Sequence, residues 1–166
     1  MNKLDLVSVP ELPLAFNADA SYFKVYLADI GLLCRRCGLT ADTVLYDSPY
    51  YKNFKGALTE NFVFNELIYT NLHPYFWRSG NTAELDFIFE YQSQLVPVEA
   101  KAEIHTRAKS YGLFCKKYKP QTGFKLSLKN IGINDSNDTK TVSLPLYLLW
   151  NIKSCLLYTS PSPRDM

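Results

Sequence analysis

The segment from Asn81 to Lys101, NTAELDFIFEYQSQLVPVEAK, most constrains how this chain can fold. It predicts two β-strands joined by a tight turn, because two β-rich runs flank the polar triplet Gln92–Gln94. Ionisable residues interrupt both runs where apolar side chains are expected. Since side chains alternate between the two faces of a strand, Glu99 and Lys101 share one face, and Asp86 points away from its apolar neighbours.

These charged residues can form a metal site. Two carboxylates on neighbouring strands, Asp86 and Glu99, can bind a hard divalent cation such as Mg²⁺ or Mn²⁺, with water completing the coordination. Lys101 can then orient a metal-bound water or stabilise the charge that develops on a phosphoryl group. The alternative is an exposed strand face on which Glu99 and Lys101 pair with neighbouring side chains.

Hydrophobic periodicity predicts further elements on both sides of this hairpin. They are a helix over Gly56–Tyr69, a strand over Tyr75–Arg78, a second helix over Thr106–Tyr118 and a strand over Gly123–Leu128. Beyond them we expect a loop or hairpin around Asn134–Asn137, and a buried strand or short helix over Leu144–Trp150. The sequence therefore predicts an α/β fold, with an αβββαβ core in which helices flank a mixed central sheet.

Several segments of the chain carry a family resemblance. They are FKVYLADIGLL, GALTENFVFNELI, YFWRSGNTAELDFIFE, LVPVEAKA, KKYKP and LPLYLLW. In this order they resemble the C-terminal domain of unknown function DUF4143 of prokaryotic AAA+-type ATP-binding proteins, a domain that is similar to PD-(D/E)XK nucleases. The resemblance extends from about Val9 to Ile152 and implies a restriction-endonuclease-like core. One departure from the nuclease motif is Leu85, which precedes Asp86 where the motif has proline.

The resemblance implies a role for each candidate site residue. Asp86 and Glu99 match the strand carboxylates, Lys101 matches the lysine, and Glu60 matches a helix glutamate that leans toward the metal. Glu84 is a candidate neighbour or alternative ligand, and the alternative for Glu60 alone is a solvated helix residue. The implied activity is Mg²⁺-dependent hydrolysis of phosphodiester bonds in DNA, in which Lys101 activates the attacking water. The alternative is a non-catalytic module that binds DNA, or that contacts and regulates an ATPase.

Charge distribution gives a second indication of function. The net charge of +2 does not indicate nucleic-acid binding, but basic residues gather between residues 101 and 129, where Glu103 is the single acid. These basic residues are Lys101, Arg107, Lys109, Lys116, Lys117, Lys119, Lys125 and Lys129. A basic segment beside carboxylates suits a phosphodiester substrate, and His105, Arg107 and Lys109 are candidate phosphate contacts. The alternative is an ordinary solvated helix face.

The chain is expected to divide into three parts. Residues 1–21 are expected to be a proline-containing linker, because in related proteins a comparable segment follows an ATPase module. Residues 22–154 are expected to form the nuclease-like domain. Residues 155–166 include CLLYTSPSPRD, which matches the translation of a sequencing-library adapter, and are expected to be an artefact and disordered. The motif G-x-x-x-x-G-K-[ST] does not occur, so we expect a fragment of a larger ATPase whose N-terminal AAA+ module binds ATP and mediates any homo-oligomer.

The sequence also predicts a cytoplasmic location. No stretch approaches the roughly 20 apolar residues of a membrane span, and the first residues do not resemble a signal peptide. Four cysteines fit a reducing compartment. Cys34 and Cys37 form a CxxC pair without a second pair of zinc ligands, so we expect them to be small core residues on a helix that begins at Phe23.

Overall fold

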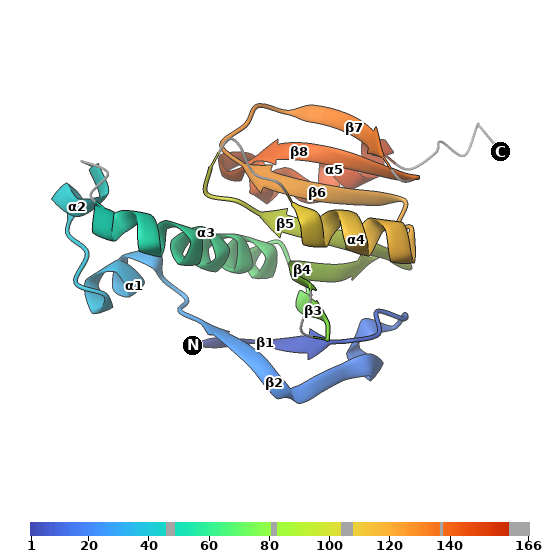
Figure 1. The fold of residues 1–166 in the computed structure, drawn as a ribbon, viewed down its shortest axis with the longest axis horizontal. Coiled ribbons are helices and arrows are strands. Elements are labelled where there is room, and N and C mark those ends of the chain that lie inside the picture. Colours follow the sequence, from blue (N-terminus) through green and yellow to red (C-terminus); the bar gives the residue numbers. More distant parts are fainter. Residues whose placement is uncertain (46–48, 81–82, 104–107, 137, 160–166) are drawn as a thin grey trace.

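The computed structural model describes residues 1–45, 49–80, 83–103, 108–136 and 138–159, which form an α/β protein built on one mixed sheet (Figure 1). The strand order across this sheet is β2-β1-β3-β4-β5-β6-β8-β7. The strands are β1 (Asn2–Val7), β2 (Ala18–Tyr26), β3 (Tyr75–Ser79), β4 (Ala83–Tyr91), β5 (Gln94–Ala100), β6 (Thr122–Ser127), β7 (Gly132–Ser136) and β8 (Thr139–Pro145).

The helices are α1 (Ile30–Arg36), α2 (Ala41–Leu45), α3 (Pro49–Tyr69), α4 (Lys109–Tyr118), α5 (Ile152–Thr159) and the 3-10 helices η1 (Leu14–Asn17) and η2 (Leu146–Asn151). Helices α3, α4, η2 and α5 pack on the sheet, whereas α1 and α2 pack on α3 to one side of it (Figure 1). The expected order of helix, three strands, helix and strand is present from α3 to β6. In the described ranges, no helix combines the length and the apolar character that crossing a membrane requires.

Two hydrophobic cores lie on opposite faces of the sheet. Side chains from α3, η2 and α5 pack with strand residues such as Phe87 and Val98 in the first core. The second core joins Phe114 of α4 to Trp77, Leu85 and their neighbours. Figure 1 shows α4 in front of the sheet and α5 behind it. The central strands are therefore covered on both sides, which explains their high apolar content.

The predicted hairpin is confirmed. Strands β4 and β5 pair antiparallel from the turn to Phe87 and Val98. The turn residues Gln92 and Ser93 have φ values of 51° and 59°. Positive φ at two successive residues is the conformation of a two-residue type I′ hairpin turn, whose twist matches that of the strands.

The N-terminal residues contribute to the sheet. Strand β1 lies between β2 and β3, antiparallel to the first and parallel to the second. Leu4 and Val7 on this strand are fully buried. Residues 2–7 are thus part of the fold, where the sequence predicted a linker, and the predicted boundary between residues 21 and 22 falls inside β2.

The predicted helix beginning at Phe23 is wrong. Phe23 belongs to strand β2, and α1 begins only at Ile30. The side chain of Asp29 accepts a hydrogen bond from the Leu32 N–H at 2.6 Å and caps this helix. Cys34 is half-buried and Cys37 is exposed, and both are free thiols, so the expectation that they are core residues is also wrong.

The C-terminal part resolves two open expectations. The polar segment around Asn134 forms a hairpin of β7 and β8, and the apolar run that follows changes from strand to 3-10 helix after Pro145. Helix α5 continues through Cys155, and Leu156 is buried in the first core. The expectation of disorder is therefore wrong for residues 155–159, and residues 160–166 lie outside the described residues.

Candidate carboxylate and lysine site

The site begins where β4 and β5 separate. Pairing of these strands ends at Phe87 and Val98, and Asp86 lies immediately beyond it. The Ala100 N–H donates a hydrogen bond to Asp86 Oδ2 at 2.8 Å. The carboxylate thus accepts the bond that a backbone carbonyl of a paired strand would accept, and this fixes Asp86 in the gap between the strands.

An irregularity in β4 places Asp86 there. On the neighbouring strand, Trp77 pairs with Leu85, whereas Tyr75 pairs with Ile88, so β4 contains one extra residue between these two pairs. Such a bulge bends a strand and redirects the side chains next to it. Leu85 and Phe87 accordingly lie in different cores, on opposite faces of the sheet.

Glu99 is a buried carboxylate in which only one of the two oxygens has a partner among the described residues. Its side chain is 5% exposed, and Oε1 forms an ion pair of 2.6 Å with Lys101 Nζ. Oε2 is buried and has no hydrogen-bond partner among the described residues. Because an unpaired buried oxygen of a charged group is costly, this atom is a place where a proton or a cation would be stabilising.

Burial raises the pKa values of both strand carboxyl groups. The pKa of Asp86 rises to about 7, first through burial and then through the negative charges of Glu99 and Glu60. Burial also raises the pKa of Glu99, although Lys101 opposes this change. Both groups therefore resist ionisation, and a cation close to them would favour their charged forms.

Lys101 remains a cation in this environment. Burial alone would lower its pKa, but the hydrogen bond and charge of Glu99, with the charges of Asp86 and Glu60, raise it above the ordinary value. A protonated ammonium group donates hydrogen bonds and stabilises negative charge, but it cannot accept a proton. The chemistry open to Lys101 near neutral pH is therefore orientation and charge stabilisation.

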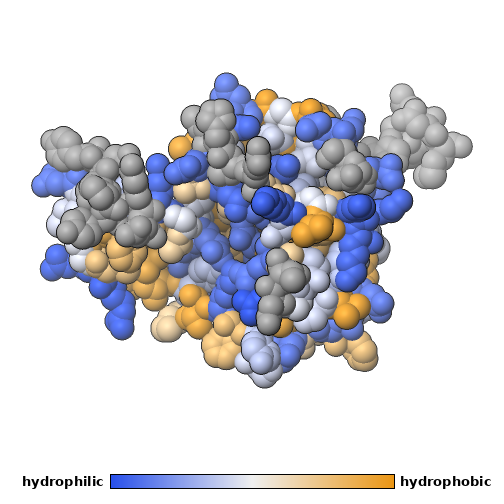
Figure 2. Space-filling view, viewed as in Figure 1, coloured by the Kyte–Doolittle hydropathy of each residue, from blue (hydrophilic) through white to orange (hydrophobic). Residues whose placement is uncertain are grey.

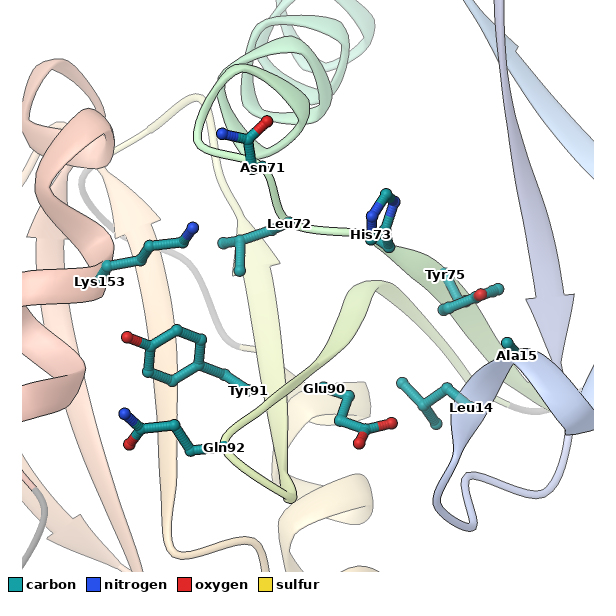
Figure 3. A pocket seen from close by; sticks show the side chains of 10 residues that line it. All are labelled: Leu14, Ala15, Asn71, Leu72, His73, Tyr75, Glu90, Tyr91, Gln92 and Lys153. Atoms are coloured by element: carbon teal, nitrogen blue, oxygen red, sulfur yellow. The ribbon is translucent and has the colours of Figure 1, made fainter.

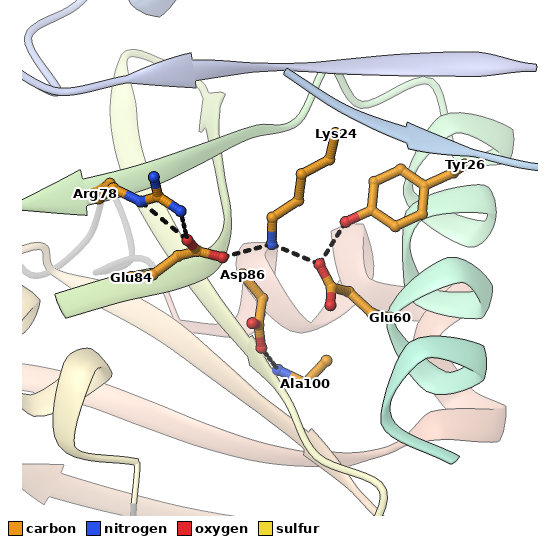
Figure 4. A network of polar contacts seen from close by, with 7 residues as sticks. All are labelled: Lys24, Tyr26, Glu60, Arg78, Glu84, Asp86 and Ala100. Atoms are coloured by element: carbon orange, nitrogen blue, oxygen red, sulfur yellow. Dashed lines mark hydrogen bonds and ion pairs between the residues drawn. The ribbon is translucent and has the colours of Figure 1, made fainter. Parts of the chain in front are cut away.

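Glu60 and Glu84 belong to a second group of charged residues, which we call the Lys24 network (Figure 4). Lys24 Nζ lies 2.7 Å from Glu60 Oε1 and 2.7 Å from Glu84 Oε1, and thus bridges α3 and β4 from β2. The Tyr26 hydroxyl donates a short hydrogen bond to Glu60, and Arg78 donates two hydrogen bonds to Glu84 Oε2 at 3.1 and 2.6 Å. Figure 2 shows a hydrophilic surface at the centre of the view, between α3 and β2.

The charges in the Lys24 network support one another. Burial would raise the pKa of Glu84, but hydrogen bonds from Lys24 and Arg78 bring it below the ordinary value. Burial opposes the charge on Lys24, but Glu60 and Glu84 raise its pKa. Burial and the charge of Glu60 raise the pKa of Tyr26, which therefore remains a hydrogen-bond donor.

Sequence reasoning missed Lys24 and Tyr26, because it placed the segment after Phe23 in a helix. The alternation of Phe23, Lys24, Val25 and Tyr26 could have indicated a strand. In the structure Phe23 and Val25 are exposed, and Lys24 and Tyr26, which alternate with them, contact Glu60. Glu60 Oε1 bonds to these two residues, while the charge of Glu60 also raises the pKa values of Asp86 and Glu99.

The arrangement fits a metal site with two carboxylate ligands better than the expected site with three. In the part of the chain that the structure describes, no three His, Cys, Asp or Glu side chains are close enough to hold a metal ion. Mg²⁺, however, is often bound by one or two carboxylates and several water molecules. Asp86 and Glu99, whose raised pKa values and free Oε2 atom favour a cation, fit such a two-carboxylate site.

The structure describes only one of the remaining predicted site residues. Lys109 is exposed at the first residue of α4. His105 and Arg107 lie outside the described residues.

Two cavities lie near opposite ends of β4 and β5. The first, of about 150 Å³, is lined by Glu99, Lys101, Ala108, Lys125, Leu126, Ser127, Lys129, Asn134, Thr141 and Ser143. The second, of about 550 Å³, lies near the β4–β5 turn (Figure 3). It is lined by Leu14, Ala15, Asn71, Leu72, His73, Tyr75, Glu90, Tyr91, Gln92 and Lys153. The second cavity contains none of the predicted site residues.

Fold and site together define a mixed α/β protein that carries a half-buried carboxylate, a buried carboxylate and a lysine where two central strands separate. The family model named "Domain of unknown function (DUF4143)" matches residues 55–147, which is more than half of the 166 residues. The chain belongs to this family. No curated protein and no solved structure matches it.

Replacing Lys24 by methionine should destabilise the protein by about 1–2 kcal/mol, because Glu60 and Glu84 would lose the cation between them. Urea unfolding of the two proteins would measure this difference. Lys3→Met is the matched control, since Lys3 pairs with Asp5 at 2.8 Å but is 43% exposed and should contribute less than about 0.5 kcal/mol. Equal effects of the two substitutions would contradict a structural role for the Lys24 network.

Proposed function

We propose that this chain is a nuclease-like domain that binds Mg²⁺ or Mn²⁺ through Asp86 and Glu99 and hydrolyses phosphodiester bonds in DNA. The observation that carries the proposal is the pair of half-buried Asp86 and buried Glu99, whose pKa values are both raised, next to the Lys101 ammonium group. Two carboxyl groups that resist ionisation would gain stability from a divalent cation.

The order of elements supports a restriction-endonuclease-like core. Helix α3, strands β3 to β5, helix α4 and strand β6 follow one another, with β4 antiparallel to both of its neighbours and β5 parallel to β6. This is the αβββαβ order that the family resemblance implies. Asp86 and Glu99 lie on the two central strands of this unit, where the resemblance leads us to expect the nuclease carboxylates.

Each residue would have a distinct task in hydrolysis. A bound divalent cation would supply Lewis-acid activation of the phosphate and of a water molecule. Asp86 and Glu99 would hold the cation, and the Ala100 N–H would keep Asp86 in place. Lys101, as an ammonium group, would orient the attacking water and stabilise negative charge on the phosphoryl oxygens. Glu60, bound to Lys24 and Tyr26, would add negative charge to the site without being a required ligand.

Calorimetric titration of Mg²⁺ and Mn²⁺ into the full chain tests the proposal. We expect binding by the wild type, and a loss of affinity of about tenfold or more in Asp86→Ala and in Glu99→Ala. Glu90→Ala is the control, because Glu90 is an exposed carboxylate near the other end of β4. Unchanged affinity in Asp86→Ala and Glu99→Ala would refute the site. If binding depends on both residues, linear, circular and branched DNA should then be tested for cleavage.

A second candidate function is a non-catalytic module that binds DNA, or that contacts and regulates an N-terminal AAA+ ATPase module. The Lys24 network favours it, because the protein's own cations already neutralise Glu60 and Glu84. A folded wild type that binds neither metal at millimolar concentration would make this second function the better one.

A further inference from the structure

A row of polar side chains crosses the sheet on the face that α4 covers in part. Glu99 of β5 is in register with Lys125 of β6, which is in register with Ser143 of β8. On the opposite face, the residues next to them, such as Phe124 and Val142, belong to the first core. Packing alone would favour apolar residues on both faces of these central strands, so the polar row requires another explanation.

The polar row lines the cavity of about 150 Å³, together with Lys101, Lys129, Asn134 and other residues. A polar cavity of this size can hold several water molecules or one small polar group. The cavity lies near the carboxyl ends of the parallel strands β5, β6 and β8, where α/β sheets commonly bind ligands.

Positive charge dominates this cavity. Lys101 is paired with Glu99, but Lys125 and Lys129 form no ion pair within the described residues. The Lys125 ammonium group lies 4.9 Å from the centroid of the Tyr111 ring, which stabilises a cation but does not neutralise it. Lys101, Lys125 and Lys129 outnumber the carboxylate of Glu99 in this lining, and with the hydroxyl and amide groups beside them they indicate an anionic ligand.

Glu99 places a further condition on the ligand. Its Oε2 atom is buried, lacks a hydrogen-bond partner among the described residues and belongs to a side chain that lines the cavity. An occupant that offers anionic oxygens to the lysines would be held most tightly if a proton or a cation also reached this oxygen. A phosphate group next to a divalent cation meets both conditions, and without the cation the lysines should still bind phosphate, but more weakly.

We propose that Lys125, Lys129 and Ser143 form a binding site for one phosphate group of a nucleic-acid strand, beside the cation site of Asp86 and Glu99. The choice of nucleic acid as the source of the phosphate rests on the proposed function. This site adds phosphate contacts on β6 and β8, and at Lys129 just after β6, to those that the sequence predicted at His105, Arg107 and Lys109. Sequence reasoning included Lys125 and Lys129 in the basic segment that suits a phosphodiester substrate, but it did not name either of them, or Ser143, as a ligand.

The test is binding of fluorescently labelled single-stranded DNA, with and without a terminal phosphate, to the full chain in EDTA. We expect Lys125→Ala to weaken binding about tenfold and to reduce the slope of log affinity against log salt by about 1. Lys125→Arg should retain most of the affinity, and inorganic phosphate should compete. Ser143→Ala, which removes only a hydroxyl group, should weaken binding too and carries the test if Lys125→Ala does not fold. Tighter binding of the phosphorylated strand would assign a terminal phosphate, and equal binding would assign an internal one.

Lys140→Ala is the matched control. Lys140 lies on the same strand as Ser143, but three positions away, and therefore on the opposite face of the sheet. Equal affinities of the wild type, Lys125→Ala and Ser143→Ala would overturn the phosphate site, and so would a wild type that binds neither DNA nor phosphate. The metal titration decides the proposed function separately, since Lys125→Ala should still bind Mg²⁺, and Asp86→Ala should still bind phosphate in EDTA.

Discussion

Replacing Gly123 by alanine is expected to destabilise the protein by about 3 kcal/mol. A Cβ atom on Gly123 would overlap the Tyr111 hydroxyl group and would lie 2.8 Å from Pro97 Cγ. Neither neighbour can move easily, because Tyr111 is buried and its hydroxyl lies 3.0 Å from the Thr141 hydroxyl, and Pro97 is part of strand β5. The substitution would push α4 away from the sheet.

Urea unfolding would measure this effect, and Gly112→Ala provides a matched control. Gly112 lies within α4, and nothing lies within 4 Å of the position that its Cβ would take. Alanine there should stabilise the helix by up to about 1 kcal/mol. The two substitutions are expected to change the free energy of unfolding in opposite directions. The comparison therefore distinguishes the steric clash at Gly123 from the effect of alanine on the backbone entropy. A Gly123→Ala protein as stable as the wild type would show that α4 does not pack on β5 and β6 as described.

The wild-type protein is expected to become less stable as the pH rises, because Asp86 then loses its proton. The substitution Asp86→Asn is expected to make this loss of stability smaller. The pKa of Asp86 is about 7 in the folded protein, against an ordinary value of 3.8. Between these values the folded state holds a proton that the unfolded state has released, so the free energy of unfolding falls with increasing pH. The loss across this pH range should be on the order of 4 kcal/mol. Asparagine resembles the protonated side chain and can still accept a hydrogen bond from the Ala100 N–H.

Unfolding at a series of pH values in EDTA would test this expectation. The slope should be smaller in Asp86→Asn, but it should persist in part because the pKa of Glu99 is also raised. Mg²⁺ at neutral pH should restore stability to the wild type, since a ligand that binds only the folded state stabilises it. Glu90→Gln, on the same strand, should leave the slope unchanged. An unaltered slope in Asp86→Asn would show that this group does not cause the pH dependence.

The central hairpin was predictable because its signals are local. The polar triplet at Gln92 lies between two β-rich runs, and charged residues at alternate positions mark one face of the second strand. The order of elements from α3 to β6 followed from the same local patterns. These patterns predicted Asp86 and Glu99 on neighbouring strands, where the structure has them, and Lys101 follows directly after the second strand.

The features that sequence reasoning missed depend on contacts between distant residues. Lys24 bonds to Glu60, 36 positions later, and nothing near Lys24 in the sequence indicates that partner. The bulge next to Asp86 arises from the register of β4 against β3, which a single strand does not specify. Strand pairing places Lys125 between Glu99 and Ser143, which are distant from it in the sequence. Each of these arrangements exists only once the sheet is assembled.

The position of β1 between β2 and β3 has a consequence for anyone who isolates this domain. The family model begins at residue 55, yet the Trp77 indole N–H donates a hydrogen bond to the Ser8 carbonyl at 3.2 Å, and Lys24 lies between Glu60 and Glu84. A version cut to residues 55–147 would expose β3 as a bare edge, prone to pair with other chains, and would leave two carboxylates without their shared cation. The stretch that similarity recognises is therefore shorter than the stretch that must be expressed to obtain a stable, monodisperse sample.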